Sequence, residues 1–409
     1  MSFISFLRAL AANSRVVRNP AADKFRRLTL VLGNESADLD SISSSLALAY
    51  TLTQTTPSDT TTIIPVINIP RADLALRPDC SALLHHTLAA AASTLSDLTF
   101  IDDIDLESIA KERLDVWLVD HNAPCSRQAW LEPFVRGIVD HHVDEAKCLD
   151  AEVREIEAVG SCATLVAQRV LSQEEEEEVV EPVLAMLLLA PILVDTSGLD
   201  PKAQRATAAD IECVQRLSTL VNWEEESGLL GGISGVRELY KHLDSLKGAV
   251  EHLSAEDLLR KDYKQWQVAD GGGRVWSVGI SSVGFPLKKW IKRDGRDAIE
   301  RAVGQWRERQ GLDMALVMTH GKSKVEGVKT YGRQLLVALG KEDDGAGREI
   351  VERLAECEIL GLQPFDEDNR HGRRGGIYWF TQCRVESSRK QVYPALKYVI
   401  ASSNNAFIK

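Results

Sequence analysis

The sequence predicts an α/β protein, with a doubly wound and mainly parallel sheet followed by a smaller α/β domain. Short apolar runs alternate with helical patterns from residue 28 to Asp195, an order typical of a parallel sheet with crossover helices. The 409 residues are enough for two or three domains, and the polar, glycine-rich residues 222–235 are typical of a boundary. We expect an N-terminal helical lead at 1–26, a first domain at 27–222, a linker at 223–235 and a second domain at 236–409.

The composition is that of a soluble globular chain, with 44% hydrophobic and 26% charged residues. A net charge of −12 disfavours general nucleic-acid binding, although basic residues focused at one site could still bind a polyanion. The seven cysteines are scattered without a CxxC pair, which indicates a reducing compartment. The longest apolar run, 179–194, is interrupted and is shorter than the roughly 20 residues that span a bilayer. We therefore expect a cytoplasmic monomer that binds neither nucleic acid nor membrane.

Residues 1–22 allow two interpretations. They contain arginines but no acidic residue, a composition typical of mitochondrial presequences. Their apolar residues also recur at the spacing of an amphipathic helix packed on the first domain. These apolar residues are Phe3, Phe6, Leu7 and Leu10. We favour the packed helix, and the mitochondrial matrix is the alternative compartment.

The stretch that organises the first domain is 28–50, LTLVLGNESADLDSISSSLALAY. Its apolar start, bounded by Gly33, predicts a buried strand, and its end from Ile42 predicts a helix. Three polar residues lie between them, namely Asn34, Asp38 and Asp40. Ligands of doubly wound sheets bind outside the carboxyl ends of the strands, so these side chains are candidate ligand groups. The alternative is that Asp38 or Asp40 simply caps the helix.

The same pattern follows three later apolar runs, which we interpret as strands. Residues 114–119 precede Asp120-His121-Asn122, and residues 134–139 precede Asp140-His141-His142. The run 189–194 precedes Asp195-Thr196. One such case would be a helix cap, but four in one chain predict a polar site at one edge of one sheet.

Converging carboxylates need cations, because two of them 4 Å apart repel by about 4 kcal/mol at an effective dielectric of about 20. The candidate ligands are mostly oxygen with one or two imidazoles, and no thiolate stands at zinc-finger spacing. Such a set favours Mg²⁺, Mn²⁺ or Co²⁺ over structural zinc. A metal pair bridged by a carboxylate is suited to attack on phosphate esters and anhydrides.

The remaining elements follow in order. Strands are predicted at 61–69, 98–101, 275–283, 313–319 and 376–385, and helices at 81–95, 162–171, 236–246 and 255–260. The adjacent pair His85-His86 points to different helix faces, so we interpret it as structural. The N–H groups after Ser161 could bind phosphate. Five glutamates at 174–178 predict a solvated loop.

Basic charge gathers near the C-terminus. From Arg370 to Lys409 there are eight Lys or Arg residues and one acid, Glu386. A charge run is usually a solvated face. Arginine forks and lysine charges can instead hold phosphate oxygens. The candidates are His371, Arg373 and Arg374 in a glycine-flanked loop, and Ser388, Arg389 and Lys390.

Seven segments together resemble a known family. The ordered motifs GNESADLDS, VDHN, VDHH, VGSCATLV and ILVDT resemble those of the DHH phosphoesterase superfamily. The later KDYK and SSRKQVYP resemble its DHHA2 C-terminal domain. The resemblance covers about residues 27–400. This combination is found in family II inorganic pyrophosphatases, yeast-type exopolyphosphatase and prune proteins, and it implies an active site in the cleft between two domains.

The resemblance also implies residue roles. Asn34 and Asp38 would bind one divalent metal, and Asp40, His141 and Asp195 a second. Asp120 would bridge both metals, and a water between them would attack phosphorus in line. His142 would face the substrate and Asp140 would orient His141 or a neighbouring backbone group. The substrate phosphates would be held by Lys264, Ser388, Arg389 and Lys390, with Asp120, His142 and Arg389 as the catalytic residues.

Asn34 departs from the pyrophosphatase pattern, which has histidine at that position. A neutral amide oxygen shifts the preference from transition metals towards Mg²⁺. The sequence therefore favours a two-metal exopolyphosphatase that uses Mg²⁺ or Mn²⁺, with Co²⁺ possible, to release orthophosphate from linear polyphosphate. The alternatives are a prune-like short-chain polyphosphatase or cyclic-nucleotide phosphodiesterase, an inorganic pyrophosphatase, and a scaffold with a vestigial site. The scaffold is disfavoured because every ligand position keeps a competent donor.

Overall fold

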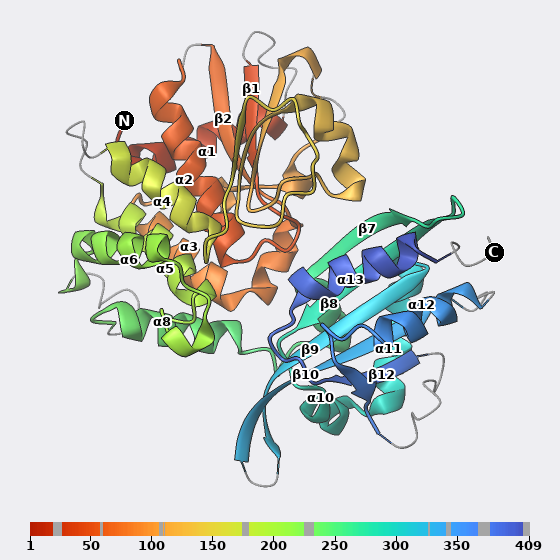
Figure 1. Ribbon diagram of the computed structural model, residues 1–409. Helices are drawn as coiled ribbons and strands as arrows, with labels where there is room; N and C mark the ends of the chain where they lie inside the picture. The colour runs from red at the N-terminus through yellow and green to blue at the C-terminus, as the bar shows by residue number, and fades with distance from the viewer. Residues whose placement is uncertain are drawn as a thin grey trace. The chain divides into compact units, whose positions relative to one another are not determined.

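The computed structural model forms two compact units, Met1–Ala249 and Val250–Lys409 (Figure 1). It describes residues 1–18, 27–57, 60–105, 109, 111–173, 180–224, 233–325, 328–340, 345–366 and 377–403. The helix that follows the predicted linker lies in the first unit, whereas the sequence assigned it to the second domain. The predicted glutamate loop at 174–178 lies outside the described residues.

The first unit contains a six-stranded parallel sheet in the order β3-β2-β1-β4-β5-β6. The strands are β1 Arg27–Leu32, β2 Thr61–Ile67, β3 Thr99–Phe100, β4 Leu114–Val119, β5 Val135–Asp140 and β6 Val153–Ile156. β1 pairs with β2 on one side and β4 on the other, so the strand order reverses there. This confirms the predicted doubly wound sheet, and ligands bind at such a reversal point. The short β6 was not predicted.

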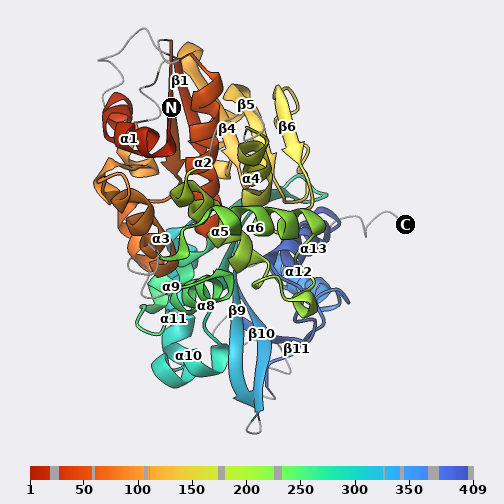
Figure 2. The same cartoon turned by 90° about the vertical axis from the view of Figure 1, so that its left-hand side faces the viewer.

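The α-helices of the first unit supply the hydrophobic cluster on one face of the sheet. They are α1 Phe3–Arg18, α2 Leu39–Thr55, α3 Pro78–Ala89, α4 Cys162–Gln173, α5 Pro182–Asp195, α6 Ala208–Leu220 and α8 Val236–Lys247. Val31 of β1 packs in the cluster with α2, α4 and α5, which lie together beside the sheet in Figure 2. Leu30 and Leu32 face the opposite cluster with Leu118 and Ile138. Strand β1 is therefore buried on both faces, as a parallel strand requires.

The prediction of a strand at 189–194 is wrong. These residues form the second half of α5, which begins with Pro182 at its first turn. Residues 183–194 are all buried, so the helix is apolar around its whole circumference and shows no helical period in its sequence. A continuous apolar run cannot distinguish a buried strand from a buried helix by periodicity alone. Asp195 thus stands at a helix C-terminus and not at a strand end.

The expected packing of the N-terminal helix is confirmed. Its predicted apolar residues are at most 3% exposed, and the rings of Phe3 and Phe6 contact Tyr50 of α2. The backbone N–H of Ile4 donates to Glu181 Oε2 at 3.1 Å, just before α5. Burying such side chains contributes about 1.5–3 kcal/mol each. Helix α1 is therefore an integral part of the first unit.

The second unit contains a mixed six-stranded sheet in the order β11-β12-β10-β9-β8-β7. The strands are β7 Tyr263–Ala269, β8 Val275–Val283, β9 Met314–Val325, β10 Val328–Leu339, β11 Leu362–Pro364 and β12 Ile377–Gln382. The helices are α9 Ala255–Lys261, α10 Leu287–Asp294, α11 Arg296–Arg309, α12 Ala346–Ala355 and α13 Arg389–Ala401. Among the described strands of this unit, β8 and β9 alone pair in parallel. One face of the sheet forms a core with α12 and α13.

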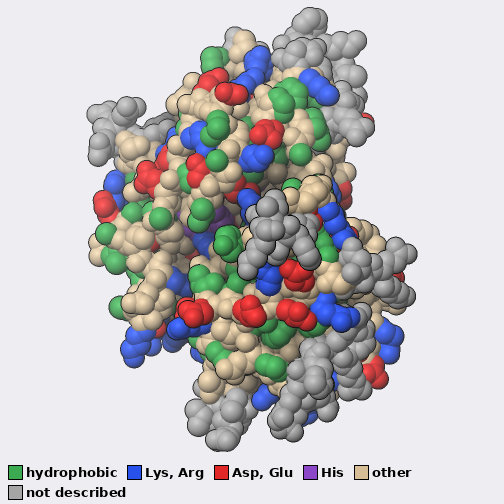
Figure 3. Space-filling view, turned by 45° about the vertical axis from the view of Figure 1, so that its right-hand side comes forward, with side chains coloured by type: hydrophobic (Ala, Val, Ile, Leu, Met, Phe, Trp, Pro, Cys, Tyr) green, Lys and Arg blue, Asp and Glu red, His purple; other side chains and the backbone are tan. Residues whose placement is uncertain are grey.

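The distribution of surface charge and the lengths of the helices bear on possible partners. On the face shown in Figure 3, Lys and Arg side chains are interspersed with Asp and Glu. Across the described part of the chain, no helix has the length and apolar character needed to cross a membrane. A surface of mixed charge means that any polyanion site must depend on a local arrangement of basic side chains.

Candidate active site

The turn between β1 and α2 is held tightly by its own side chains. The Ser41 hydroxyl accepts the backbone N–H of Asn34 at 2.7 Å, and a Cβ on Gly33 would lie 2.4 Å from that oxygen. Asp38 is the N-cap of α2 and accepts the N–H of Ser41 at 3.2 Å. Ala37 adopts a left-handed φ of 43°, a strained conformation that such a turn must hold in place. The cap that we considered for Asp38 is thus present.

Asn34 is oriented by hydrogen bonds on both sides of its amide. Its Oδ1 accepts the N–H groups of Ser36 at 2.8 Å and Ala37 at 3.2 Å. Its Nδ2 donates to Asp120 Oδ2 at 2.5 Å and to the Asp120 carbonyl at 3.2 Å. In this arrangement the amide hydrogens, and not the amide oxygen, face the neighbouring acid.

Asp40 is held by the first turn of α4. Its carboxylate accepts the N–H groups of Cys162 at 2.7 Å and Ala163 at 2.8 Å, and the Ser44 hydroxyl at 3.1 Å. The positive end of the helix stabilises this buried charge. The N–H groups of Cys162 and Ala163, which we considered as phosphate-binding groups, therefore donate to Asp40 instead.

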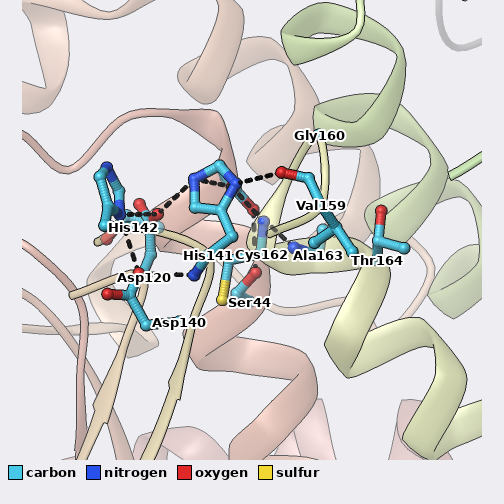
Figure 4. A network of polar contacts seen from close by, with 12 residues as sticks. Ser44, Asp120, Asp140, His141, His142, Val159, Gly160, Cys162, Ala163 and Thr164 are labelled. Carbon is cyan, nitrogen blue, oxygen red and sulfur yellow. Dashed lines mark hydrogen bonds and ion pairs between the residues drawn. The ribbon is translucent and has the colours of Figure 1, made fainter. Parts of the chain in front are cut away.

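Asp120 has the features expected of a ligand to a cation. It follows β4 in a left-handed conformation with φ of 63° and is 2% exposed. Among the described residues its Oδ1 accepts no hydrogen bond, yet it lies 3.4 Å from His141 Nε2 and 3.7 Å from His142 Nδ1 (Figure 4). Burial, and then the neighbouring Asp40 carboxylate, raise the pKa of Asp120 well above its ordinary value. A cation would offset both costs.

The two histidines after β5 are oriented by different groups. His141 Nδ1 lies 3.0 Å from the Val159 carbonyl, which leaves Nε2 towards Asp120. His142 Nδ1 lies 2.8 Å from Asp140 Oδ1. Holding one ring nitrogen in this way fixes the direction in which the other ring nitrogen points.

Asp140 is the centre of the hydrogen-bond network around His142. Its Oδ1 also accepts the backbone N–H of His141 at 2.8 Å, and its Oδ2 accepts Asn122 Nδ2 at 2.5 Å. Burial would raise the pKa of Asp140, but the hydrogen bonds from His142 and Asn122 lower it far below its ordinary value. These contacts favour the ionised form of Asp140 and hold the His142 ring, and Asn122 is a partner that the sequence did not reveal.

Asp195 and Lys247 form a second part of the site. Burial and the Asp40 charge raise the pKa of Asp195 to about 7, although the Lys247 charge opposes the shift. Burial lowers the pKa of Lys247, but the Asp195 and Asp38 carboxylates raise it on balance. Lys247 is the last residue of α8 and brings a positive charge to an acidic cluster. No local sequence pattern points to Lys247, because its partners lie far away along the chain.

These residues fit a divalent cation. Asp120, His141 and His142 each offer a ligand atom, and the three atoms lie within 4.8 Å of one another. The Asp120 oxygen that makes no hydrogen bond points between the imidazoles, while Asp38, Asp40 and Asp195 interact with it or with each other electrostatically. An oxygen-rich set with imidazole suits Mg²⁺ or Mn²⁺.

The predicted phosphate-binding residues of the second unit lie near the start of α13. Ser388 caps this helix, and Arg389 Nη2 contacts Asp262 Oδ1 at 2.7 Å. Lys264 lies on β7, two residues from Asp262. Lys390 is exposed in the first turn of α13. The predicted residues His371, Arg373 and Arg374 lie outside the described residues.

Comparisons with known proteins agree with the two units. The DHH family N-terminal domain matches residues 29–192, and the DHHA2 domain matches residues 241–399. A Schizosaccharomyces pombe protein named for an inferred exopolyphosphatase activity is 33% identical over 403 residues, covering 95% of this chain and 94% of that protein. The rat protein named exopolyphosphatase PRUNE1 is 35% identical over 277 residues, which cover 67% of this chain and 56% of the rat protein.

A solved structure supports the fold. The Methanococcus jannaschii protein described by an inferred family II inorganic pyrophosphatase activity has a TM-score of 0.59 and 20% identity, covering 92% of this chain and 99% of that chain. At this identity the likeness concerns the fold alone. Together with the site and the matched domains, the S. pombe relative shows that the chain belongs to the DHH phosphoesterase family, in the group with a C-terminal DHHA2 domain.

Proposed function

We propose that this protein is a metal-dependent exopolyphosphatase that hydrolyses the terminal phosphoanhydride of linear polyphosphate. The observation that carries the proposal is the buried Asp120 oxygen, which accepts no hydrogen bond among the described residues and faces two oriented imidazoles. The similarity to the S. pombe relative along 95% of the chain supports the substrate class. The family alone would also allow pyrophosphate as the substrate, since a relative from Methanocaldococcus jannaschii, 24% identical, is named a manganese-dependent inorganic pyrophosphatase.

Bound divalent cations would neutralise phosphate charge and activate a water for in-line attack. We propose two ions, Mg²⁺ or Mn²⁺, with Asp120 contacting both. Asp38 and Asn34 would complete one ligand set, and His141 with the two remaining acids would complete the other. Asp40 brings to this set a carboxylate already fixed by the amides of α4.

His142, Asp140 and Asn122 would together prepare the site for proton transfer. His142 is held by Asp140 through Nδ1, so its Nε2 is the nitrogen that can donate a proton to the leaving phosphate oxygen. The ionised Asp140 stabilises the charged imidazole that such a donor needs. Asn122 in turn fixes Asp140, so the donor is oriented before substrate binds.

Asn34 would act in two ways. Its Nδ2 donor fixes the Asp120 carboxylate in the observed arrangement. As a ligand it would rotate its amide by half a turn and give up two N–H donors on Oδ1. That rotation weakens Asn34 as a metal ligand relative to an imidazole, in agreement with a preference for Mg²⁺ over transition metals.

The second unit would supply the cations for substrate phosphates. Arg389 is already oriented by its contact with Asp262, so its guanidinium fork needs little ordering to meet phosphate oxygens. Lys264 and Lys390 add point charges, and Ser388 adds a hydroxyl. From the sequence alone we also propose that His371, Arg373 and Arg374 contact longer substrates.

The test is phosphate release from long-chain polyphosphate, tripolyphosphate, pyrophosphate and cyclic AMP, each with Mg²⁺ and with Mn²⁺. We expect the largest kcat/KM with long-chain polyphosphate and Mg²⁺, and no turnover after metal removal with EDTA. A larger kcat/KM for pyrophosphate or cyclic AMP would replace this proposal by one of the two short-substrate alternatives. No turnover of any of the four substrates would favour the scaffold.

A further inference from the structure

The longest hairpin of the second unit extends beyond its sheet. β9 and β10 pair along their whole lengths, from Met314 with Leu339 to Val325 with Val328. The neighbouring strand β8 pairs with β9 only as far as Thr319, and β12 pairs with β10 only from Arg333. Figures 1 and 2 both show the two strands projecting as a ribbon from the rest of the unit. We call residues 320–325 and 328–333 the ribbon.

One face of the ribbon is basic. Residues paired across an antiparallel ladder share a face, and the faces alternate along each strand. The register pairs His320 with Arg333, Lys322 with Tyr331 and Lys324 with Lys329, so all six backbone positions belong to one face. The other face has Gly321 with Gly332, Ser323 with Thr330 and Val325 with Val328. In the sequence the six backbone positions of this face hold lysine, arginine, histidine and tyrosine, and no acid is among them.

The base of this face is fixed to the start of α13. Arg333 is 6% exposed, and its Nε donates to the Val385 carbonyl at 2.7 Å. Its guanidinium carbon lies 5.7 Å from the Tyr331 ring centre. Further out, Lys322 is exposed, and no ion pair of its side chain is found among the described residues. The basic face thus begins at the buried Arg333 and continues to the solvent-exposed Lys322.

The basic face continues the sheet face that carries the proposed phosphate-binding residues. Nearer the sheet, Met318 and Leu335 form the next pair on the same face as His320 and Arg333, and both pack in one core with residues of α13. Lys264 pairs with Ile280, which belongs to that same core. Val385 stands three residues before Ser388, where α13 is capped. Positive charge is therefore distributed along one face of one sheet, from Lys264 and the α13 N-terminus to the ribbon.

We propose that the basic face of the ribbon binds the part of a long inorganic polyphosphate chain that extends beyond the phosphates held at Lys264 and Arg389. This inference rests on the proposed exopolyphosphatase function. A strand advances about 6.6–6.8 Å between positions on the same face, so the positions of the basic face recur at an even spacing that an extended polyanion can follow. Short substrates would end before they reach it. The ribbon would then give this enzyme its preference for chain length.

The test compares charge reversal on the ribbon with charge reversal elsewhere in the same unit. The ribbon variant is Lys322→Glu. The matched control is Arg301→Glu on α11, where Arg301 is exposed. Helix α11 contributes no described residue to the core shared with α12 and α13, so this control lies away from the sheet face of the ribbon. Lys322→Gln is a milder second variant, and thermal unfolding checks that each variant is folded.

We expect the ribbon variant to raise KM for long-chain polyphosphate roughly two- to fivefold, because one exposed charge that would attract the chain then repels it. KM for tripolyphosphate and both kcat values should stay unchanged, since lost uniform binding appears in KM. The effect should shrink in high salt, because exposed charges are screened. Equal changes for both substrates, or equal changes in the Arg301 control, would overturn the proposal.

Direct binding separates this proposal from the function on which it rests. Binding of fluorescent long-chain polyphosphate in EDTA needs no turnover, and we expect the ribbon variant to weaken it by the same factor. Unchanged binding would overturn the ribbon proposal even if wild type hydrolyses polyphosphate. Weakened binding would uphold the ribbon as a polyphosphate site even if hydrolysis fails. Loss of single-stranded RNA binding with intact polyphosphate binding would assign the ribbon to nucleic acid and overturn the proposal.

Discussion

The acidic sheet edge of the first unit and the basic ribbon of the second use charge in opposite ways. Asp40, Asp120 and Asp140 are each at most 3% exposed, and they are oriented by backbone N–H groups, amides and imidazoles. Lys322 of the ribbon is exposed and its row follows simple strand alternation. Buried charges interact strongly and depend on geometry, whereas exposed charges interact weakly and are screened. This contrast agrees with the proposed chemistry at the first region and the proposed attraction of a polyanion at the second.

This difference also separates the expected kinetic effects. A change at the acidic edge should lower kcat, because it removes interactions that matter at the reacting phosphate. A change on the ribbon should raise KM for long substrates and respond to salt. Substitutions in each region should therefore separate an effect on kcat from an effect on KM for long substrates.

The largest effect is expected for Asp120→Asn. The asparagine keeps the shape but loses the charge that would hold both cations, so kcat should fall at least 100-fold. The variant should be no less stable than wild type without metal, because burial and Asp40 already disfavour the Asp120 charge. Phosphate release and thermal unfolding in EDTA measure the two quantities.

A matched control is Asp115→Asn on the same strand. Asp115 pairs with Arg27 and Arg136, away from the site, so this variant should keep its activity. Asp120→Asn with more than about a tenth of wild-type activity would refute the bridging role, since even the loss of an outer partner typically costs 10–100-fold.

A smaller effect is expected for Asp140→Asn. The variant should lower kcat roughly 10–100-fold and leave KM nearly unchanged, because Asp140 orients His142 without contacting the substrate. Without the negative neighbour the imidazolium loses its proton more easily, so the alkaline limb of the kcat–pH profile should move to lower pH. The loss should be the same in low and high salt, unlike that of the ribbon variant. An unchanged pH profile would show that Asp140 acts only on the fold.

Much of the acidic edge could be predicted from the sequence because its residues follow apolar runs directly. The runs before Asp120 and Asp140 form β4 and β5, whose carboxyl ends meet at one sheet edge. The same reasoning put Asp195 at a strand end, although α5 carries it. Asp195 nevertheless interacts with Asp40 and Asp38, because the C-terminus of a buried helix can approach the same edge. Periodicity fails only where burial is complete around the element.

Other features depend on distant contacts that no local pattern reveals. Lys247 gains its role from acids of α2 and α5, and Asn122 gains its role from Asp140. The amide orientation of Asn34 follows from two backbone donors in its own turn. The basic face of the ribbon could have been found from the alternation HGKSK and KTYGR, but only once the pairing of the two strands was known. A period of two assigns faces, and register decides which faces combine.

The smallest effect expected concerns pH and the metal-free protein. The pKa of Asp195 is raised to about 7 from 3.8, so the folded state favours the protonated carboxyl. Stability from this group is therefore fully present below about pH 4 and is lost as the pH rises through about 7. We expect wild type in EDTA to lose on the order of 1–2 kcal/mol of unfolding free energy between pH 5 and pH 8, since one pKa unit corresponds to about 1.4 kcal/mol and partial exposure screens the charge.

Added Mg²⁺ should raise the unfolding temperature more at pH 8 than at pH 5, because it binds the ionised acids. Asp195→Asn should flatten the pH dependence in EDTA, whereas Lys322→Glu on the ribbon should keep it. An Asp195→Asn protein with the wild-type pH dependence would show that the acidic edge is not strained by its own charge, and the contrast between the two regions would then be one of geometry alone.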